Sequence, residues 1–465
     1  MRISDNDRFR EANSVRIVIV GDGKVGSTLV ANLAGENHDI IVIDTDPHAL
    51  TSTTDRYDVV GICGNGAAYA VQKQAGVDKC DLLIATTSSD ERNILCCMVA
   101  NQLGAGNTIA RVRNPEYASH MKYLKDNLKL SMYINPELEA AEEISRILRF
   151  PTAIKVSPFM FDRVEMIEIR LKEGSPLVGM SLVKMKRYYN EDILICTVLR
   201  NDKAIIPNGE FVLEAGDRVS IIATPEVLNS FARKIFPNSH KVRNVMIIGG
   251  SRIAHYLSKQ LVDVGVKVKI IDNDLNRCKE LSAELPEAQI IFGNARDREL
   301  LLEEGLEKMD AFVTLTSVDE ENIIASMLGV TYNIQKVVTK INDTDMAAMM
   351  YKLGLDVAVS PKDITADTII RYVRAMANSG ESSMTTLHTI CNAQVEVMEF
   401  RVEGDMPFLG KHLMDLHIKA QTLIGCVVRN GQAIIANGST TIEKNDNVIV
   451  VAAKGKIKEL GDILR

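Results

Sequence analysis

Tryptophan is absent from this chain of 465 residues, and all aromatic residues together make up only 5% of it. Flat side chains on which nucleic-acid bases could stack are therefore few. The formal charge is -7, and the sequence has no basic stretch. Because nucleic-acid-binding domains carry clustered lysine and arginine, this composition argues against nucleic acid as the main partner.

Long hydrophobic runs are also missing. The longest, such as VIVVAA at 448–453, fall well short of the ~18 residues of a membrane-spanning helix and are typical of buried strands. Residues 1–14 are too charged for a secretory signal, and we expect a disordered leader there. The eight cysteines form no CxxC pair and have no histidine at metal-ligand spacing, which favours a reducing cytoplasm and no metal site.

One plan is present twice in the chain. Residues 15–46 (VRIVIVGDGKVGSTLVANLAGENHDIIVIDTD) return as 242–274 (VRNVMIIGGSRIAHYLSKQLVDVGVKVKIIDND). Each segment has the pattern of a strand, a glycine-containing turn, a helix and a second strand that ends in aspartate. The match continues along both halves with few insertions, which predicts a tandem duplication of a nucleotide-binding βαβ unit.

Within each half, the first part has the pattern of a wound sheet. Short runs rich in valine and isoleucine alternate with helical stretches over 15–134 and again over 242–359. This alternation predicts two Rossmann-like, doubly wound parallel sheets, with ligand clefts at the carboxyl ends of their strands. Crossover helices are expected over 135–150 and, with a linker, over 360–387.

The second part of each half alternates apolar and polar residues. Residues 151–236 and 388–465 are each predicted to form a small β-rich α+β module. In the first module, hairpin turns are expected at Asn201-Asp202 and at Asn208-Gly209. The predicted fold class is therefore α/β, with two tandem Rossmann-like domains that are each followed by such a module.

The glycine turn of the first half carries the clearest chemistry. In GDGKVG, Gly21 permits a tight turn, Gly23 lets the backbone approach a pyrophosphate, and Gly26 allows close packing of the helix. Asp44 ends the next strand, where a carboxylate can accept both ribose hydroxyls. Because this acid would repel a 2′-phosphate, NAD(H), ATP or ADP are favoured over NADP. The alternative is a wound sheet that has lost its ligand.

In the second half the corresponding turn, 249–254, has lost two of these glycines. Ser251 and Ala254 stand in their places, and their β-carbons would crowd a pyrophosphate. Asp272 and Asp274 still end the second strand. The sequence leaves two interpretations open, an altered and weaker nucleotide site or a purely structural copy.

Polar residues recur where the later strands of each sheet end. Asn65, Thr86 and Arg111 follow or end the third, fourth and fifth strands of the first sheet. Asn294 and Lys340 hold two of the same positions in the second. These side chains would face the cleft, where they could meet base, ribose and phosphate. Ordinary turn chemistry is the alternative explanation.

The ordered series GDGKVG, IDTDP, CGNG, ATTSSDERNI, ARVRNPEY, NPELEAAEEISRILRFP and SPLVGMSL resembles the RCK (regulator of potassium conductance) family. The tandem form is similar to the cytosolic TrkA-type subunits of Trk potassium uptake systems. The resemblance implies a non-enzymatic gating ring that is a homo-oligomer, in the family a tetramer of the two-unit chain. It also implies nucleotide binding, docking beneath a TrkH-type transmembrane subunit, and a cytoplasmic location, peripheral to the inner face of the cell membrane.

The resemblance also implies which residues line the two sites. For the first site these are Gly21, Gly23, Gly26, Asp44, Thr45, Asp46, Asn65, Thr86 and Arg111. For the second site they are Asp272, Asp274, Asn294 and Lys340. It further implies that the helices after Asn135 and Ser360 lie at contacts between units, whereas their periodicity alone favours packing on their own domain.

We expect nucleotide-dependent conformational coupling as the mechanism, because a ligand shifts a protein only if it binds two shapes unequally. The protein could respond to the difference between ATP and ADP or to that between NADH and NAD+, and the sequence does not decide between these two ligand pairs. An NAD-dependent dehydrogenase is the rival from another class, but the β-rich modules place no histidine near a candidate lysine or acid. A nucleotide-sensing regulator of an unrelated partner is the third possibility.

Overall fold

The computed structural model describes residues 14–464, except 37, 119, 161, 344–345, 347–348, 351–352, 378–381 and 393. The leader predicted over 1–14 therefore lies, apart from Ser14, outside the described residues. The chain divides into two compact units. The first comprises Met1–Ala141 with Ser360–Ala377, and the second comprises Glu142–Val359 with Asn378–Arg465.

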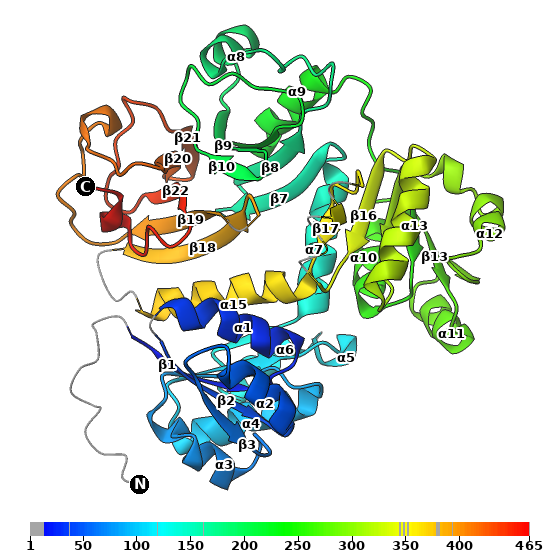
Figure 1. Ribbon diagram of the computed structural model, residues 1–465, viewed down its shortest axis with the longest axis vertical. Coiled ribbons are helices and arrows are strands. Elements are labelled where there is room, and N and C mark those ends of the chain that lie inside the picture. The colour runs from blue at the N-terminus through cyan, green and yellow to red at the C-terminus, as the bar shows by residue number, and fades with distance from the viewer. Residues whose placement is uncertain are drawn as a thin grey trace. The chain divides into compact units, whose positions relative to one another are not determined.

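A six-stranded parallel sheet forms the centre of the first unit (Figure 1). Its strands are β1 (Arg16–Val20), β2 (Asp39–Asp44), β3 (Val60–Cys63), β4 (Leu82–Ala85), β5 (Asn107–Arg111) and β6 (Met132–Ile134). They lie in the order β3-β2-β1-β4-β5-β6, and every pairing is parallel. This is the doubly wound arrangement predicted from the sequence, with a change of direction between β1 and β4.

The helices of the first unit connect these strands. They are α1 (Lys24–Leu33), η2 (Ala34–Glu36), α2 (Pro47–Thr54), α3 (Tyr69–Gln74), η3 (Val77–Lys79), α4 (Asp90–Leu103), α5 (Pro115–Ala118) and α6 (Met121–Asn127). Strand residues such as Val18 and Leu83 are fully buried, and they pack with Cys97 of α4 in one core. Burial on both faces at the centre of the sheet explains why β1 and β4 read as continuous apolar runs.

A helix from the second half of the chain completes the first unit. This helix, α15 (Pro361–Ala377), packs against α1 (Figure 1). Its Tyr372 hydroxyl donates to Asn107 Oδ1 at 3.0 Å, and Arg374 forms an ion pair with Glu36. Burial alone would raise the pKa of Glu36, but the neighbouring His38 and the hydrogen bonds from Arg374 hold it at about 2. The helix after Ser360 thus packs on the sheet domain of the first half.

The second unit contains a parallel sheet of the same topology. Its strands are β12 (Asn244–Ile248), β13 (Lys267–Asp272), β14 (Gln289–Phe292), β15 (Ala311–Thr314), β16 (Lys336–Lys340) and β17 (Ala358–Val359), in the order β14-β13-β12-β15-β16-β17. Its helices are α10 (Arg252–Asp263), α11 (Leu275–Glu284), α12 (Arg298–Glu303), η4 (Leu306–Lys308) and α13 (Asp319–Thr331). The duplication inferred from the sequence is therefore a duplication of fold.

Two antiparallel modules also belong to the second unit. The first follows α7 (Pro136–Arg149) and consists of β7 (Ala153–Phe159), β8 (Val164–Arg170), α8 (Leu182–Tyr189), β9 (Leu194–Arg200), β10 (Lys203–Ile205), β11 (Arg218–Ala223) and α9 (Pro225–Ile235). The second consists of β18 (Ser382–Ile390), β19 (Val395–Val402), η5 (Leu413–Asp415), β20 (Thr422–Arg429), β21 (Gln432–Ile435), β22 (Asn447–Ala453) and η6 (Leu460–Ile463). Their five-stranded sheets have the orders β10-β9-β11-β8-β7 and β18-β19-β22-β20-β21.

The two modules share one hydrophobic core. Phe159 and Ile222 of the first module pack with Val397, Cys426 and Val451 of the second. This joint core explains why neither small sheet must bury its apolar face alone. The fold class predicted from the sequence, Rossmann-like domains each followed by a β-rich module, is confirmed.

One predicted hairpin is correct and the other is wrong. Asn201 and Asp202 both have positive φ, 50° and 59°, as a tight turn between β9 and β10 requires. The turn expected at Asn208-Gly209 joins no strand pair, because β11 pairs with β8 and β9. The segment after β10 instead bonds to the start of α8, where the Val183 N–H donates to the Gly209 carbonyl at 2.9 Å.

No helix among the described residues is long and apolar enough to cross a membrane.

Candidate functional site

The glycine turn between β1 and α1 is shaped by close approaches of the backbone. Gly21 has φ +100°, and a β-carbon there would lie 2.9 Å from the Thr87 nitrogen. A β-carbon on Gly26 would collide with the Gly21 carbonyl oxygen. A β-carbon on Gly23, in contrast, would meet nothing within 4 Å. The second glycine therefore faces open space, whereas the other two are required by the turn itself.

The N-terminus of α1 lies beside that open space. Gly23 is its N-cap, and no described side chain makes a capping hydrogen bond there. The first amide groups of a helix have no partner within the helix, and with the helix dipole they attract anions. The turn thus combines an open approach with unpaired donors, as a phosphate site needs.

Asp44 is fixed next to this turn. Its Oδ2 accepts a hydrogen bond from the Asp22 N–H at 2.6 Å, and its Oδ1 accepts from the Asp46 N–H at 2.8 Å. Asp46 in turn caps α2, because its Oδ1 accepts from the His48 N–H at 2.9 Å. Each carboxylate oxygen of Asp44 still has lone-pair capacity, so the oriented group can accept hydroxyl donors. Thr45, between the two acids, is exposed.

The predicted residues at the later strand ends have different roles. The Thr86 hydroxyl is buried and bonds to the Gly21 carbonyl at 3.1 Å, so it supports the turn from behind. Asn65 is exposed, and its Oδ1 accepts from the Ala67 N–H at 3.1 Å. Arg111 Nη1 donates to the Thr86 carbonyl at 3.3 Å, which holds its guanidinium at the end of β4.

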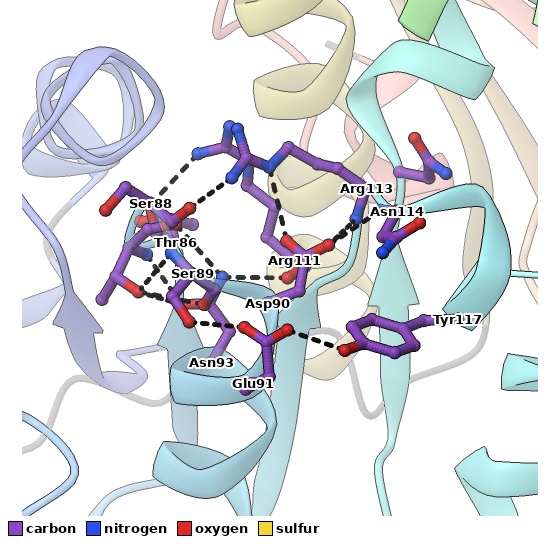
Figure 2. Close-up of polar contacts among 12 residues, drawn as sticks. Thr86, Ser88, Ser89, Asp90, Glu91, Asn93, Arg111, Arg113, Asn114 and Tyr117 are labelled. Carbon is purple, nitrogen blue, oxygen red and sulfur yellow. Dashed lines mark hydrogen bonds and ion pairs between the residues drawn. The ribbon is translucent and has the colours of Figure 1, made fainter. Parts of the chain in front are cut away.

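A second arginine stands beside Arg111 and was missed in the sequence (Figure 2). Arg113 donates from Nε to Asp90 Oδ1 at 3.3 Å and also to the Ser88 carbonyl. Asp90 is buried, and its Oδ2 accepts the N–H groups of Arg113 and Asn114, both at 2.8 Å. The alternation in ARVR was the available signal, because residues two apart in an extended chain share a side.

Further hydrogen bonds join the ends of β4 and β5 (Figure 2). Asn93 is fully buried; its Oδ1 accepts from the Thr87 N–H at 2.8 Å, and its Nδ2 donates to the Arg111 carbonyl at 2.9 Å. Hydrogen bonds from Ser89 and Tyr117 lower the pKa of the exposed Glu91. The two arginines therefore project from a frame that is held together by hydrogen bonds within the protein.

The second half preserves the frame of this site. Asp272 Oδ2 accepts from the Gly250 N–H at 2.5 Å, and its Oδ1 accepts from the Asp274 N–H at 2.7 Å. Lys340 Nζ donates to the Thr316 carbonyl at 2.9 Å, just past the end of β15, whereas Arg111 donates to the Thr86 carbonyl, one position earlier in the matched strand end. Asn294 forms the same local turn as Asn65, accepting from the Arg296 N–H at 2.9 Å.

The second half differs where a phosphate would sit. Ser251 caps α10, since its Oγ accepts from the Ala254 N–H at 3.4 Å. Arg277 reaches across the turn and donates from Nε to the Gly250 carbonyl at 2.7 Å. Asn342 stands in the place of Arg113, so this copy has one cation fewer at its strand ends, whereas Arg277 at the turn replaces Ala49 of the first half. The open helix N-terminus of the first half thus has no equivalent in the second.

Two domain families, each matched twice, cover most of the chain. The TrkA-N domain matches residues 17–136 and 245–361, and the TrkA-C domain matches residues 166–235 and 397–465. The chain belongs to the TrkA family. The wound domains described above are its TrkA-N domains and the antiparallel modules contain its TrkA-C domains, which confirms the resemblance seen in the motif series.

Full-length relatives in the TrkA family are similar over almost their entire length. The Trk system potassium uptake protein TrkA homolog of Archaeoglobus fulgidus is 33% identical over 97% of this chain and 100% of its own. The TrkA proteins of Halomonas elongata and Vibrio alginolyticus are 32% and 30% identical, over 96% and 95% of this chain and 98% and 96% of theirs. These relatives are named as potassium uptake proteins of the Trk system.

Solved structures show the same fold. The GsuK channel matches with a TM-score of 0.64 and 16% identity, over 96% of this chain and 78% of that one. The GsuK RCK domain matches with a TM-score of 0.63 and 17% identity, over 96% and 94%. A structure of the GsuK channel bound to NAD gives a TM-score of 0.62 at 16% identity, over 96% and 78%. This TrkA family member therefore has the tandem RCK fold.

Proposed function

We propose that this protein is a cytosolic nucleotide-binding regulatory subunit, which gates a Trk-type potassium uptake system by ligand-dependent conformational change. One observation carries the proposal: the glycine turn of the first half is open at Gly23, beside an uncapped helix and the oriented Asp44 carboxylate. The family supplies the context, because the full-length relatives are Trk potassium uptake proteins.

For each residue of the first site we propose a role in nucleotide binding that follows from the chemistry of its side chain or backbone. The amides at Gly23 and the start of α1 bind phosphate, and Asp44 accepts the ribose hydroxyls. Arg111 and Arg113 provide positive charge at the strand ends for a further phosphate. Gly21, Gly26, Thr86 and Asn65 shape the turns, and Thr45 and Asp46 border the ribose. This donor set suits NAD(H) as well as ATP or ADP.

For the second site we propose weaker binding or none. Asp272, Asp274, Asn294 and Lys340 keep the frame that would hold an adenosine. The Ser251 cap uses the helix amide that a phosphate would need. The sensing role then belongs mainly to the first half.

We assign no catalytic step to the protein. A dehydrogenase would need a general acid or base beside the nicotinamide. Several of the polar groups around the first glycine turn, among them Asp44, Thr86 and Arg113, are engaged in holding the frame. A change in NADH absorbance when the protein is mixed with cofactor and a panel of metabolites would support the dehydrogenase hypothesis instead.

Assembly into a homo-oligomer, a tetramer by analogy with the family, is supported by matched apolar residues on corresponding helices. Leu95 and Met98 on α4 are 48% and 42% exposed, and Ile324 and Met327 on α13 are 61% and 42% exposed. Exposed apolar residues three apart on a helix form a stripe that another protein surface can cover. We propose that further copies of this chain cover these stripes, and that the ring docks on a TrkH-type transmembrane subunit at the inner face of the cell membrane.

The ligand proposal is tested by replacing Asp44 with alanine. The variant loses an acceptor for two hydroxyl groups, so affinity for ADP or NAD should fall on the order of tenfold to a hundredfold. Calorimetry measures this directly, with Asp272→Ala as the matched change in the second half. Unchanged affinity in Asp44→Ala would refute the ribose assignment.

A further inference from the structure

Asp22 lies in the middle of the first glycine turn and has an unusual environment. Its side chain is 7% exposed, and neither carboxyl oxygen has a hydrogen-bond partner in the described part of the chain. Its own N–H donates to Asp44 Oδ2 at 2.6 Å, so the two acids are neighbours. A buried carboxylate without donors is costly, whereas the neutral acid is tolerated far better.

The surroundings act in the same direction. Burial raises the pKa of Asp22 most, the Thr53 hydroxyl lowers it, and the charge of Asp44 raises it further, so the net pKa lies above the ordinary value of 3.8. The other charged groups on the adjoining elements are exposed: Lys24 begins α1, and residues 46–48 at the start of α2 include an aspartate and a histidine.

The second half shows that the acid is not needed for the turn. Gly250 holds its position, and a β-carbon there would lie 2.6 Å from Leu281 Cδ1 and 3.4 Å from Arg277 Cγ. In the first half, the smaller Thr53 and Ala49 occupy the positions of that leucine and arginine. The first half thus has both the Asp22 carboxyl group and the space that accommodates it, and it is also the half whose helix N-terminus is open.

We propose that the first site binds a proton together with its nucleotide, and that the Asp22 carboxyl holds this proton. The proposal rests on the proposed function, because it requires nucleotide phosphates at the turn. Those phosphates bring negative charge next to Asp22 and remove the remaining water around it. Both effects favour the neutral acid over the carboxylate.

Linkage then fixes the direction of the pH dependence. If binding raises the proton affinity of Asp22, protons are taken up when nucleotide binds, and nucleotide affinity falls as pH rises. One linked proton changes affinity by at most about tenfold per pH unit, between the pKa of the free and the bound protein. The site would then respond to acidification as well as to nucleotide.

Calorimetry tests the proposal by counting protons. Binding of ADP and of NAD is measured at one pH in buffers of different ionisation enthalpy, for the wild type and for Asp22→Asn. Subtracting the variant cancels protons that belong to the ligand. We expect the wild type to take up more protons per bound nucleotide than the variant, and equal uptake in both would overturn the proposal.

Two controls separate the possible failures. Asp22→Gly copies the residue of the second half and provides a second variant if the asparagine does not fold, and Asp58→Asn removes an exposed acid and should leave proton uptake unchanged. If the wild type binds neither probe, the proposed function fails and the proton site fails with it. If it binds with the same proton uptake as both Asp22 variants, only the proton site fails.

Discussion

Three glycines in one turn have three different physical roles. Gly21 needs a positive φ, and Gly26 must be small because of the Gly21 carbonyl, whereas Gly23 has free space where a side chain would point. The first two are constraints of the free protein. The third is a constraint only if a ligand approaches, so the two kinds of glycine can be separated by experiment.

Gly23→Ala should therefore weaken nucleotide binding without loss of stability. Its φ of -78° is accessible to alanine, so the free energy of unfolding should change by less than about 1 kcal/mol. Affinity for ADP or NAD should drop because the new methyl group occupies the approach of the phosphates. Denaturant titration and calorimetry measure the two effects.

Gly26→Ala is the matched control, since its β-carbon would collide with the Gly21 carbonyl oxygen. This variant should lose stability by about 1–3 kcal/mol. If Gly23→Ala is also strongly destabilised, or binds nucleotide as well as the wild type, the assignment of Gly23 to the phosphate approach is wrong.

Single residues also show why the sequence predicted only part of the site. Asp44 and the glycines were predictable, because the motif fixes their position in a βαβ unit. Asp90 was not, because its partners, the N–H groups of Arg113 and Asn114, follow another strand and meet it only in the folded sheet. That a serine replaces a glycine at position 251 was evident from the sequence. That its side chain caps α10 and so occupies the helix N-terminus was not.

At the scale of elements, the contact between α1 and α15 joins the two halves of the chain. The helix that would bind phosphate packs against a helix of the second half, and the Glu36–Arg374 ion pair lies in this contact. Periodicity had favoured packing of α15 on its own domain, because an apolar face does not identify its partner. The misplaced hairpin at Asn208-Gly209 has a similar cause, since turn residues do not show which strand comes next in space.

Glu36→Gln should destabilise the protein in a pH-dependent way. The pKa of Glu36 is lowered from 4.5 to about 2, so the charged form stabilises the fold above pH 4.5, and this contribution is lost as pH falls toward 2. The variant should lose about 2 kcal/mol of unfolding free energy at pH 7. Chemical denaturation at pH 7 and at pH 3 measures whether the difference shrinks on acidification.

The exposed Glu287 provides a control for this change, because Glu287→Gln should have little effect at either pH. A loss in Glu36→Gln that is the same at pH 7 and at pH 3 would show that the charge of Glu36 does not stabilise the α1–α15 contact.

At the scale of the whole molecule, two TrkA-N and two TrkA-C domains form a chain with one open glycine turn and one that is capped from within. The duplicated plan was evident from the sequence, because matched motifs recur in order. The proposed difference in nucleotide binding between the copies was not, because it rests on hydrogen bonds of Ser251 and Arg277 that only the structure reveals.

The assembly proposal predicts a change in mass on disruption of the apolar stripes. Leu95→Asp combined with Ile324→Asp places a charge in each stripe, and a surface buried between copies cannot accommodate it. Light scattering should then give a smaller assembly than for the wild type. Tyr188→Asp, which changes a 73% exposed residue on α8, should leave the mass unchanged. An unaltered mass in the double variant would show that the stripes do not lie in the interface between copies.

The central claim concerns regulation of potassium movement by a nucleotide bound in the first half. It is tested by potassium flux through the TrkH-type transmembrane subunit in liposomes, measured with the wild-type protein and with Asp44→Ala, with and without ADP, ATP, NAD+ or NADH. We predict that at least one of these nucleotides changes the flux with the wild-type protein and that the effect is lost in the variant. A flux that responds to no nucleotide, or responds equally in both proteins, would contradict the account.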